Sequence, residues 1–517
     1  MPDHMERFER FRGKHGLVMG LGLFGGGVEA ARFLAGYCSR VIVTDLREAS
    51  VLAESIDALR GLSVEFRLGE HREQDFREAD VVIHSPAVRP DHKLLQVARD
   101  ADAEVTMEMS LFIEACPATT IGITGSNGKT TTTALCYEML CEVLERAQPE
   151  LAGEWADAKT VPLQAGNPRE RVWLGGNIGQ PLLTRVGEMT PFDVVVLELS
   201  SFQLSDWRRI MRSCNVGIIT NITPNHLDWH RDFAEYRDAK TAVFEYWSEW
   251  GDPPLALVNA DDPECAAIAA RNPGRYRLVS TREPLVTELF QPGRRQPFAS
   301  GMGGKLQVQG LVGRDLLSRE QLRLPGDFNW ANAVMAATAA ATVLNPEQSD
   351  AIARGAARFR GVEHRLELCG QLRGARVYND SIATDPAATI AALQAFPGPL
   401  RVLMGGGSKN IDYGALGRAM AAHGNVHGVY LQGATGPAIR EALLQAGIDP
   451  SVIHECAGFE AACGAAFQAI RQGEVLLMSP ASTSFYEYAP GKRFTNFEDR
   501  GRFFKALVQA QSNARPS

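Results

Sequence analysis

The chain has 517 residues, a hydrophobic content of 45%, a charged content of 22% and a formal net charge of −8 at pH 7. A chain of this length is too long for one hydrophobic core, and we expect about three domains. Its acidic balance argues against a nucleic-acid-binding protein, which normally has a basic face. It has no apolar run of about 18 residues, so we expect no membrane span, and its polar N-terminus predicts no signal peptide.

A strand–turn–helix–strand pattern opens the chain. An apolar segment leads into a glycine-rich turn at 16–27, and the second strand, at 40–45, ends in an acid. Gly20, Gly22 and Gly25 have the spacing of the dinucleotide-binding fingerprint, in which an acid follows the second strand. This motif is weak on its own, and an NAD-dependent dehydrogenase is the competing interpretation.

Residues 121–133 carry the most informative pattern. An apolar strand leads into glycines, and Lys129 with four threonines opens a predicted helix that includes 134–143. A glycine-rich loop at a helix N-terminus binds anions, because its backbone N–H groups point at phosphates and the lysine adds a positive charge. Thr130 can offer its hydroxyl to Mg²⁺, although Ile123 stands where the usual loop begins with glycine. We expect this loop to bind ATP through Gly125, Ser126, Asn127, Gly128, Lys129, Thr130 and Thr131.

Apolar runs followed by polar residues recur along the rest of the chain. Polar residues at the carboxyl ends of parallel strands gather at one sheet edge, where ligands bind. The strands are expected at 64–69, 79–86, 192–200, 216–222, 254–259, 375–380, 400–407, 428–433 and 474–481. Between them, 145–171 reads as a surface insertion and 281–319 as loops or small strands.

This alternation predicts an α/β fold with three domains. We place a Rossmann-like domain at 1–115, a central P-loop-type ATPase domain with a mainly parallel sheet at 116–360, and a C-terminal Rossmann-like α/β domain at 361–517.

Several motifs together closely resemble the Mur ligases, from Gly20 to about Phe503. They are the loop at 124–130 and the clusters at 175–179, 197–204, 221–228, 236–240 and 379–384. The resemblance implies an ATP-dependent, ADP-forming ligase that passes through an acyl phosphate. The resemblance is strongest to family members that add D-glutamate to UDP-N-acetylmuramoyl-L-alanine in the cytoplasmic stage of peptidoglycan biosynthesis.

The resemblance also assigns roles around ATP. It implies that Lys129, Glu198, His226 and Lys240 are catalytic, and that Thr130, Glu198, His226 and Lys240 surround Mg²⁺. In the family, the lysine that matches Lys240 is carbamylated. The remaining nucleotide contacts are Asn329, Asn332, Arg365 and Asp380. Two residues depart from the family pattern: Phe328 replaces a histidine, and Ile382 replaces a lysine that many relatives carry.

The substrate residues implied by the resemblance fall into two groups. The first group, for the UDP-linked substrate, comprises Leu23, Phe24, Asp45, Leu46, Arg47, Ser85, Asn177, Ser200 and Gln203. The second group, for the incoming glutamate, comprises Thr384, Lys409, Ser484, Phe485 and Phe497. Lysine and hydroxyl donors suit an acidic substrate. The stretch 485–495 is about six residues longer than the family pattern.

Other functions stay open at this point. The chain could be a related ligase that uses L-glutamate or another amino acid, a folate-polyglutamating enzyme, or a nucleotide-binding switch. The folate enzyme would not usually carry the first domain. Nine cysteines without a metal-binding spacing indicate a reducing cytoplasm. We therefore expect a cytoplasmic monomer that uses ATP and Mg²⁺, with UDP-N-acetylmuramoyl-L-alanine and glutamate as substrates and no nucleic-acid partner.

Overall fold

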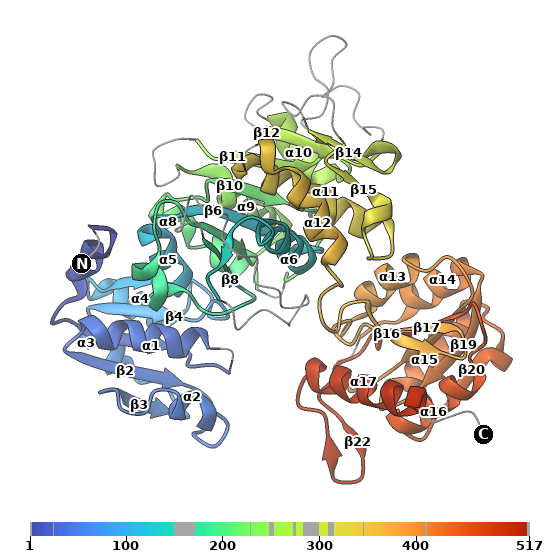
Figure 1. Ribbon diagram of the computed structural model, residues 1–517. Coiled ribbons are helices and arrows are strands. Elements are labelled where there is room, and N and C mark those ends of the chain that lie inside the picture. Colours follow the sequence, from blue (N-terminus) through green and yellow to red (C-terminus); the bar gives the residue numbers. More distant parts are fainter. Residues whose placement is uncertain are drawn as a thin grey trace. The chain divides into compact units, whose positions relative to one another are not determined.

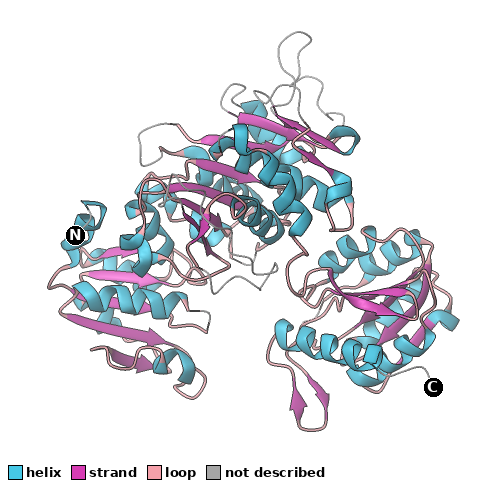
Figure 2. Cartoon of the chain, in the orientation of Figure 1, coloured by secondary structure: helices cyan, strands magenta, loops and turns pink. Residues whose placement is uncertain are grey.

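The computed structural model describes residues 3–23, 25–148, 171–227, 229–247, 253–271, 276–282, 299–308, 315–344, 346–408 and 411–513. These residues form two compact units (Figure 1). The first unit holds the described residues up to Gln321 together with Ala331–Ala357, and the second holds Leu322–Trp330 and the described residues from Arg358 onward. Strands and helices alternate in both units (Figure 2), which confirms the α/β prediction. Among the described helices, none has the length and apolar character needed to cross a bilayer.

A parallel five-stranded sheet opens the first unit, in the order β3-β2-β1-β4-β5. Its strands are β1 (His15–Met19), β2 (Arg40–Asp45), β3 (Glu65–Leu68), β4 (Val81–His84) and β5 (Glu104–Thr106). The helical segments are η1 (Asp3–Phe11), α1 (Gly26–Tyr37), α2 (Ala53–Asp57), α3 (Glu73–Glu78), α4 (Lys93–Asp100) and α5 (Glu108–Ala115). Gly27 allows α1 to approach the turn after β1, because a Cβ atom there would lie 2.3 Å from the Leu21 carbonyl oxygen.

The second sheet of this unit has ten strands in the order β15-β14-β13-β12-β11-β10-β6-β9-β8-β7. Its strands are β6 (Thr119–Thr124), β7 (Glu145–Arg146), β8 (Arg171–Gly176), β9 (Val194–Glu198), β10 (Val216–Ile219), β11 (Leu255–Asn259), β12 (Tyr276–Ser280), β13 (Ala299–Ser300), β14 (Lys305–Val308) and β15 (Leu317–Ser318). Pairing is parallel from β7 to β13 and antiparallel between β13, β14 and β15.

Helices and short 3₁₀ segments flank this second sheet. They are α6 (Lys129–Leu140), η3 (Leu183–Glu188), α7 (Ser201–Leu204), α8 (Trp207–Ile210), α9 (Phe233–Glu245), α10 (Pro263–Arg271), η5 (Met302–Gly304), η6 (Arg319–Gln321), α11 (Asp327–Val343), η7 (Pro346–Gln348) and α12 (Asp350–Arg358). The sequence-based estimate of 134–143 set the helix end too late, because α6 already ends at Leu140. Strand residues lie at both ends of the predicted insertion, whose residues 149–170 are outside the described part of the chain.

The second unit has a six-stranded sheet in the order β16-β17-β21-β18-β19-β20. Its strands are β16 (Glu367–Leu372), β17 (Ala375–Asn379), β18 (Leu400–Met404), β19 (Val426–Leu431), β20 (Ile453–Glu455) and β21 (Val475–Met478). The helical segments are α13 (Pro386–Gln394), α14 (Gly414–His423), α15 (Gly436–Gln445), η8 (Pro450–Val452), α16 (Phe459–Ala469) and α17 (Phe497–Asn513). The long stretch before α17 forms a hairpin of β22 (Glu487–Ala489) and β23 (Lys492–Arg493), which projects from this unit (Figure 2).

Candidate active site

The loop between β6 and α6 has the geometry of an anion site. Gly125 and Gly128 have φ angles of 150° and 80°, a region that favours glycine. A Cβ atom on Gly125 would lie 2.0 Å from Thr220 Oγ1, and one on Gly128 would lie 2.3 Å from Asn332 Oδ1. Glycine is therefore required at both positions, and the loop leads into the N-terminus of α6, a place where proteins commonly bind anions.

A second loop, which follows β10, holds the phosphate loop in shape. The Ser126 N–H donates to the Asn221 carbonyl oxygen at 2.8 Å, and the Asn127 N–H donates to Asn221 Oδ1 at 2.9 Å. The Ser126 hydroxyl donates to the Thr223 carbonyl oxygen at 2.9 Å and lies 2.9 Å from the Tyr236 hydroxyl. Each contact joins segments far apart in the sequence, so the anion site is fixed by the sheet rather than by the loop alone.

Two lysines converge on this loop. Lys129 Nζ donates to the carbonyl oxygens of Gly125 and Ser126 at 3.0 and 2.9 Å. Lys240 Nζ, on α9, donates to the Gly125 carbonyl oxygen at 2.9 Å and lies 4.5 Å from the centre of the Tyr236 ring. Burial, and next the charge of Lys129, hold the pKa of Lys240 well below its usual value, while Glu198 acts in the opposite direction.

Glu198 ends β9 and is buried. Its Oε1 atom accepts a hydrogen bond from Asn177 Nδ2 at 3.2 Å, whereas its Oε2 atom is buried without a hydrogen-bond partner. An unsatisfied buried carboxylate oxygen is costly and is a suitable ligand for a hard cation. The position of Thr130 in the first turn of α6 adds a hydroxyl to the loop. This donor set fits Mg²⁺.

Three predicted site residues, Ser200, Gln203 and His226, lie at or near α7. The Ser200 and Gln203 side chains form a capping box, in which each accepts a hydrogen bond from the other's backbone N–H, at 2.9 and 3.2 Å. His226 is exposed on a turn with a φ angle of 53°, and its ring centre lies 4.8 Å from that of Phe202. The structure therefore places the His226 ring against the Phe202 ring of α7.

The two asparagines predicted to contact the nucleotide begin α11, and both are buried. Asn332 belongs to the first unit, where it packs against Gly128 of the phosphate loop. Asn329 belongs to the second unit, where its Nδ2 atom donates to the Pro325 carbonyl oxygen at 2.7 Å. Phe328, which replaces the histidine of the family pattern, precedes both asparagines in the sequence and is exposed.

A cavity of about 370 Å³ lies within the first unit, between the glycine-rich turn after β1 and the ends of β8 and β9. The predicted residues that line it are Leu23, Ser85, Asn177, Ser200 and Gln203. The turn packs tightly on one wall, because a Cβ atom on Gly20 would lie 2.9 Å from Ser85 Cβ. A concave site with apolar walls and several polar groups is typical of a small-molecule site.

Three predicted substrate residues lie outside this cavity lining, within the described part of the chain. Asp45 Oδ2 accepts a hydrogen bond from the Gly22 N–H at 3.1 Å, and its Oδ1 accepts one from the Arg47 N–H at 2.9 Å. Asp45 thereby joins the glycine-rich turn to the loop after β2, where Leu46 and Arg47 are exposed. Phe24 lies outside the described residues.

Asp380, in the second unit, is buried at the end of β17. It accepts hydrogen bonds from the Ser479 hydroxyl at 2.8 Å and from the Leu366 N–H at 3.2 Å. Burial raises its pKa to about 7, although the hydrogen bond from Ser479 and the charge of Arg365 oppose this shift. Arg365 Nε is buried without a hydrogen-bond partner, so a polar ligand atom could complete this site.

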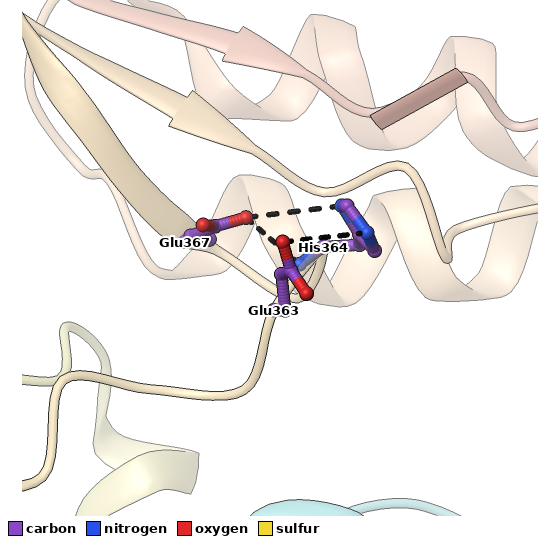
Figure 3. Close-up of side chains that lie close together, drawn as sticks. All are labelled: Glu363, His364 and Glu367. Atoms are coloured by element: carbon purple, nitrogen blue, oxygen red, sulfur yellow. Dashed lines mark hydrogen bonds and ion pairs between the residues drawn. The ribbon is translucent and has the colours of Figure 1, made fainter. Parts of the chain in front are cut away.

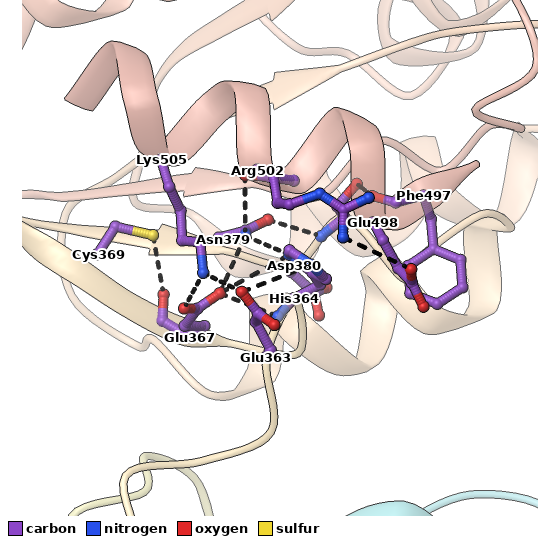
Figure 4. Close-up of polar contacts among 12 residues, drawn as sticks. Glu363, His364, Glu367, Cys369, Asn379, Asp380, Phe497, Glu498, Arg502 and Lys505 are labelled. Atoms are coloured by element: carbon purple, nitrogen blue, oxygen red, sulfur yellow. Dashed lines mark hydrogen bonds and ion pairs between the residues drawn. The ribbon is translucent and has the colours of Figure 1, made fainter. Parts of the chain in front are cut away.

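A compact cluster of charged side chains surrounds His364 (Figure 3). One potential ligand atom each from Glu363, His364 and Glu367 lie within 4.8 Å of one another. Lys505 Nζ, however, donates to Glu363 Oε1 and, at 2.9 Å, to Glu367 Oε1 (Figure 4). Because the lysine ammonium already pairs with both carboxylates, we interpret the cluster as an ion-pair network that supports the Arg365 segment.

The described residues that are predicted to bind the glutamate substrate lie on two loops and at the start of α17, in the second unit. Ser484 is buried, Phe485 is exposed, and Thr384 and Phe497 are partly buried. The Phe497 carbonyl oxygen accepts a hydrogen bond from the Ser381 hydroxyl at 2.7 Å, three residues before Thr384 in the chain. Lys409 lies outside the described residues.

Arg500 was not predicted from the sequence. It is fully buried and ties the two loops together, since its Nη2 atom donates to the Ser381 carbonyl oxygen at 2.8 Å and its Nη1 atom donates to those of Ser482 and Thr483 at 3.2 and 3.3 Å. Arg500 stands among other charged residues in the sequence, so no local pattern indicated that it would join the two loops.

Three domain families match the chain. They are the Mur ligase MurD-like N-terminal domain at 14–107, the Mur ligase middle domain at 123–340, and the Mur ligase glutamate ligase domain at 364–482. The phosphate loop and the cavity lining lie mainly in the first two matches, and Asp380 lies in the third.

Curated relatives extend this similarity over nearly the full length. A UDP-N-acetylmuramoylalanine--D-glutamate ligase from Roseiflexus sp. (strain RS-1) is 37% identical over 510 residues, which is 96% of this chain and 99% of that protein. A protein of the same name from Ruminiclostridium cellulolyticum is 33% identical and covers 98% of this chain and 99% of its own length.

A solved structure is similar in fold. The pseudomurein peptide ligase type C from Methanothermus fervidus matches with a TM-score of 0.52 and 18% identity, over 96% of this chain and 99% of that chain.

Proposed function

This chain belongs to the Mur ligase family, and we propose that it joins D-glutamate to UDP-N-acetylmuramoyl-L-alanine in an ATP-dependent, ADP-forming reaction. The ligase phosphorylates the carboxylate of the sugar nucleotide, and the amine of glutamate then displaces phosphate from the acyl phosphate. We further propose that it is a cytoplasmic monomer and requires Mg²⁺.

One observation carries this proposal. Asn177 lines the cavity of the first unit, and the same side chain donates a hydrogen bond to Glu198 beside the phosphate loop. A sugar nucleotide in the cavity would therefore extend toward the residues that are suited to hold ATP and a cation. Phosphoryl transfer requires this kind of proximity between acceptor and donor.

Charge stabilisation is the main task of the residues at the phosphate loop. Lys129 supplies positive charge to the transferring phosphoryl group. Glu198, Thr130, His226 and a carbamylated Lys240 would hold Mg²⁺, which when bound neutralises charge on the phosphates. Within the loop at 125–131, the N–H groups of Ser126 and Asn127 hold the loop in shape, and the N-terminus of α6 binds phosphate oxygens.

We assign the remaining recognition tasks by position. Leu23 and Ser85, with Ser200 and Gln203, bind the sugar nucleotide in the cavity, and Asp45 orders the glycine-rich turn. Phe24, Leu46 and Arg47 stay predictions for the uridine end. Asn329, Asn332, Arg365 and Asp380 contact the nucleotide, and the residues for glutamate are Thr384, Lys409, Ser484, Phe485 and Phe497.

The test is ADP release from ATP with UDP-N-acetylmuramoyl-L-alanine and a panel of D- and L-amino acids. We expect release to require both the sugar nucleotide and D-glutamate, and we expect an amide product in equal amount. ATP turnover without either substrate would favour a nucleotide-binding switch. Preference for L-glutamate, or for another amino acid, would favour the related ligase instead.

A further inference from the structure

The cavity of the first unit contains a carboxyl group to which the proposed reaction gives no role. Glu108 is the first residue of α5 and lines the cavity together with Ser85 and Asn177. Its Oε1 atom is buried and has no hydrogen-bond partner. A buried polar atom without a partner costs free energy, so its presence in the wall of a ligand cavity points to a ligand atom that completes it.

A second carboxylate lies close to Glu108. It belongs to Glu29 of α1, and α1, α5 and η3 pack against one another. Glu29 Oε1 accepts a hydrogen bond from the Thr184 N–H at 2.8 Å and another from the Thr184 hydroxyl. Both groups donate to the same carboxylate oxygen, so Thr184 fixes the position of the Glu29 side chain.

This environment favours the uncharged form of Glu108. Burial, and next the charge of Glu29, raise the pKa of Glu108 to about 8, although the backbone of Leu183 opposes the shift. At neutral pH the Glu108 carboxyl group therefore keeps its proton and can donate a hydrogen bond.

Several other charged groups on α5 and on the elements packed against it are paired with one another. These pairs are Arg10–Glu104 and Arg10–Glu114 from η1, Arg209–Asp206 from α8, and Arg185–Glu188 from η3. His84 of β4 is a further titratable residue of the cavity lining, and burial lowers its pKa, so it is neutral at pH 7. Glu29 is thus the neighbouring charged residue that raises the pKa of Glu108.

We propose that Glu108, in its uncharged form, binds the sugar-nucleotide substrate by donating a hydrogen bond from its carboxyl group to an oxygen of that molecule. This inference rests on the proposed function, which assigns the cavity to UDP-N-acetylmuramoyl-L-alanine. The substrate carries a diphosphate and a carboxylate. A neutral carboxyl group can donate to it, whereas a carboxylate in the same place would repel it.

The proposal makes substrate affinity depend on pH. Because the substrate binds the protonated form, its binding raises the pKa of Glu108 above the value of about 8 in the free protein. Affinity is therefore level below about pH 8 and falls as the pH rises further, by up to about tenfold per pH unit.

The experiment is isothermal titration calorimetry of the full-length protein with UDP-N-acetylmuramoyl-L-alanine. The dissociation constant is measured at a series of pH values from about pH 6.5 to about pH 9.5. Three proteins are compared: the wild type, Glu108→Gln and Glu29→Gln. Glutamine keeps the shape and a donor but cannot ionise, so the affinity of Glu108→Gln should lack the fall. Glu29→Gln removes the neighbouring negative charge and lowers the pKa of Glu108, so the fall should begin at lower pH.

A purely structural role for Glu108 would not move the pH profile in this way. Glu29→Gln leaves Glu108 itself intact, so its shifted profile tests the proposal even where Glu108→Gln does not fold. Equal pH profiles for all three proteins would overturn the role of Glu108 while leaving the proposed function in place. Absence of binding by the wild type at every pH would overturn the proposed function and this inference together.

Discussion

The amines of Lys129 and Lys240 donate hydrogen bonds to the same acceptor, the carbonyl oxygen of Gly125, at 3.0 and 2.9 Å. Lys240 is buried, and the charge of Lys129 adds to the effect of burial in lowering its pKa. Two ammonium groups on one carbonyl oxygen would repel each other, and the charged form of the more buried Lys240 is the one that burial disfavours. A neutral amine at this position is a nucleophile.

Carbamylation of Lys240 is the first prediction. The neutral amine attacks CO₂, forms an N–C bond and releases a proton, which leaves an anionic carbamate beside Glu198 and the phosphate loop. Such oxygen ligands suit Mg²⁺, whereas an ammonium would repel it. Lys240→Ala should be nearly inactive, and a short carboxylic acid that fills the vacated space should restore part of the activity.

The control for this rescue is the same acid added to Lys129→Ala, whose defect it should not repair. Mass spectrometry under CO₂ and a high-resolution structure of the active, Mg²⁺-loaded enzyme examine the modification directly. A bare amine in that structure would contradict the prediction.

Loss of the Lys129 charge should abolish catalysis without unfolding the protein. Lys129→Ala removes an electrostatic stabiliser of the transferring phosphoryl group, which commonly costs on the order of 10²–10³ in rate. The measurement is ADP release, with circular dichroism to check the fold. Lys14 is exposed, so Lys14→Ala serves as the matched control, which removes a lysine charge away from the phosphate loop. Near-normal ADP release by a folded Lys129→Ala protein would refute the ATP site.

Local sequence pattern was sufficient for many of the strands and for the phosphate loop, whereas β5, β12, β16 and β20 were not predicted. The apolar, β-branched run at 40–45 with its terminal acid predicted β2 with both of its ends, because such a run is typical of a buried parallel strand. The glycines of the loop predicted the turn between strand and helix, and Gly125 and Gly128 have positive φ angles there.

Residues whose role depends on distant partners escaped prediction. Arg500 binds Ser381 across 119 positions, and Lys505 binds Glu363 across 142. Glu108 looked like an ordinary acid at the first turn of a helix, and only its packing beside Glu29 gives it another chemistry. Such pairings follow from the fold, and no local pattern of residues contains them.

Asp380 should make stability depend on pH. Its folded-state pKa of about 7 lies above the ordinary value of 3.8, so the folded state prefers the protonated acid. Its contribution to stability is complete below about pH 4 and is lost as the pH rises through about 7. Asp380→Asn should remove this loss, which we expect to be on the order of a few kcal/mol. Urea unfolding of both proteins below and above this range measures it, with the substitution of an exposed acid of the same unit, Asp412→Asn, as the control. If the free energy of unfolding had the same pH dependence in the wild type and in Asp380→Asn, this prediction for Asp380 would be wrong.

Glutamate recognition should be separable from recognition of the sugar nucleotide. Ser484 and Lys409 are assigned to the carboxylates of glutamate, and a hydrogen bond to a charged group contributes about 1.5–3 kcal/mol. Ser484→Ala and Lys409→Ala should therefore raise the KM for glutamate by about tenfold to a hundredfold, while the KM for the sugar nucleotide changes little. Ser451, exposed in the same unit, provides the control substitution Ser451→Ala. Steady-state kinetics with each substrate varied in turn distinguishes the two effects. An equal rise in both KM values would indicate that Ser484 supports the fold of the loop braced by Arg500 and does not contact glutamate.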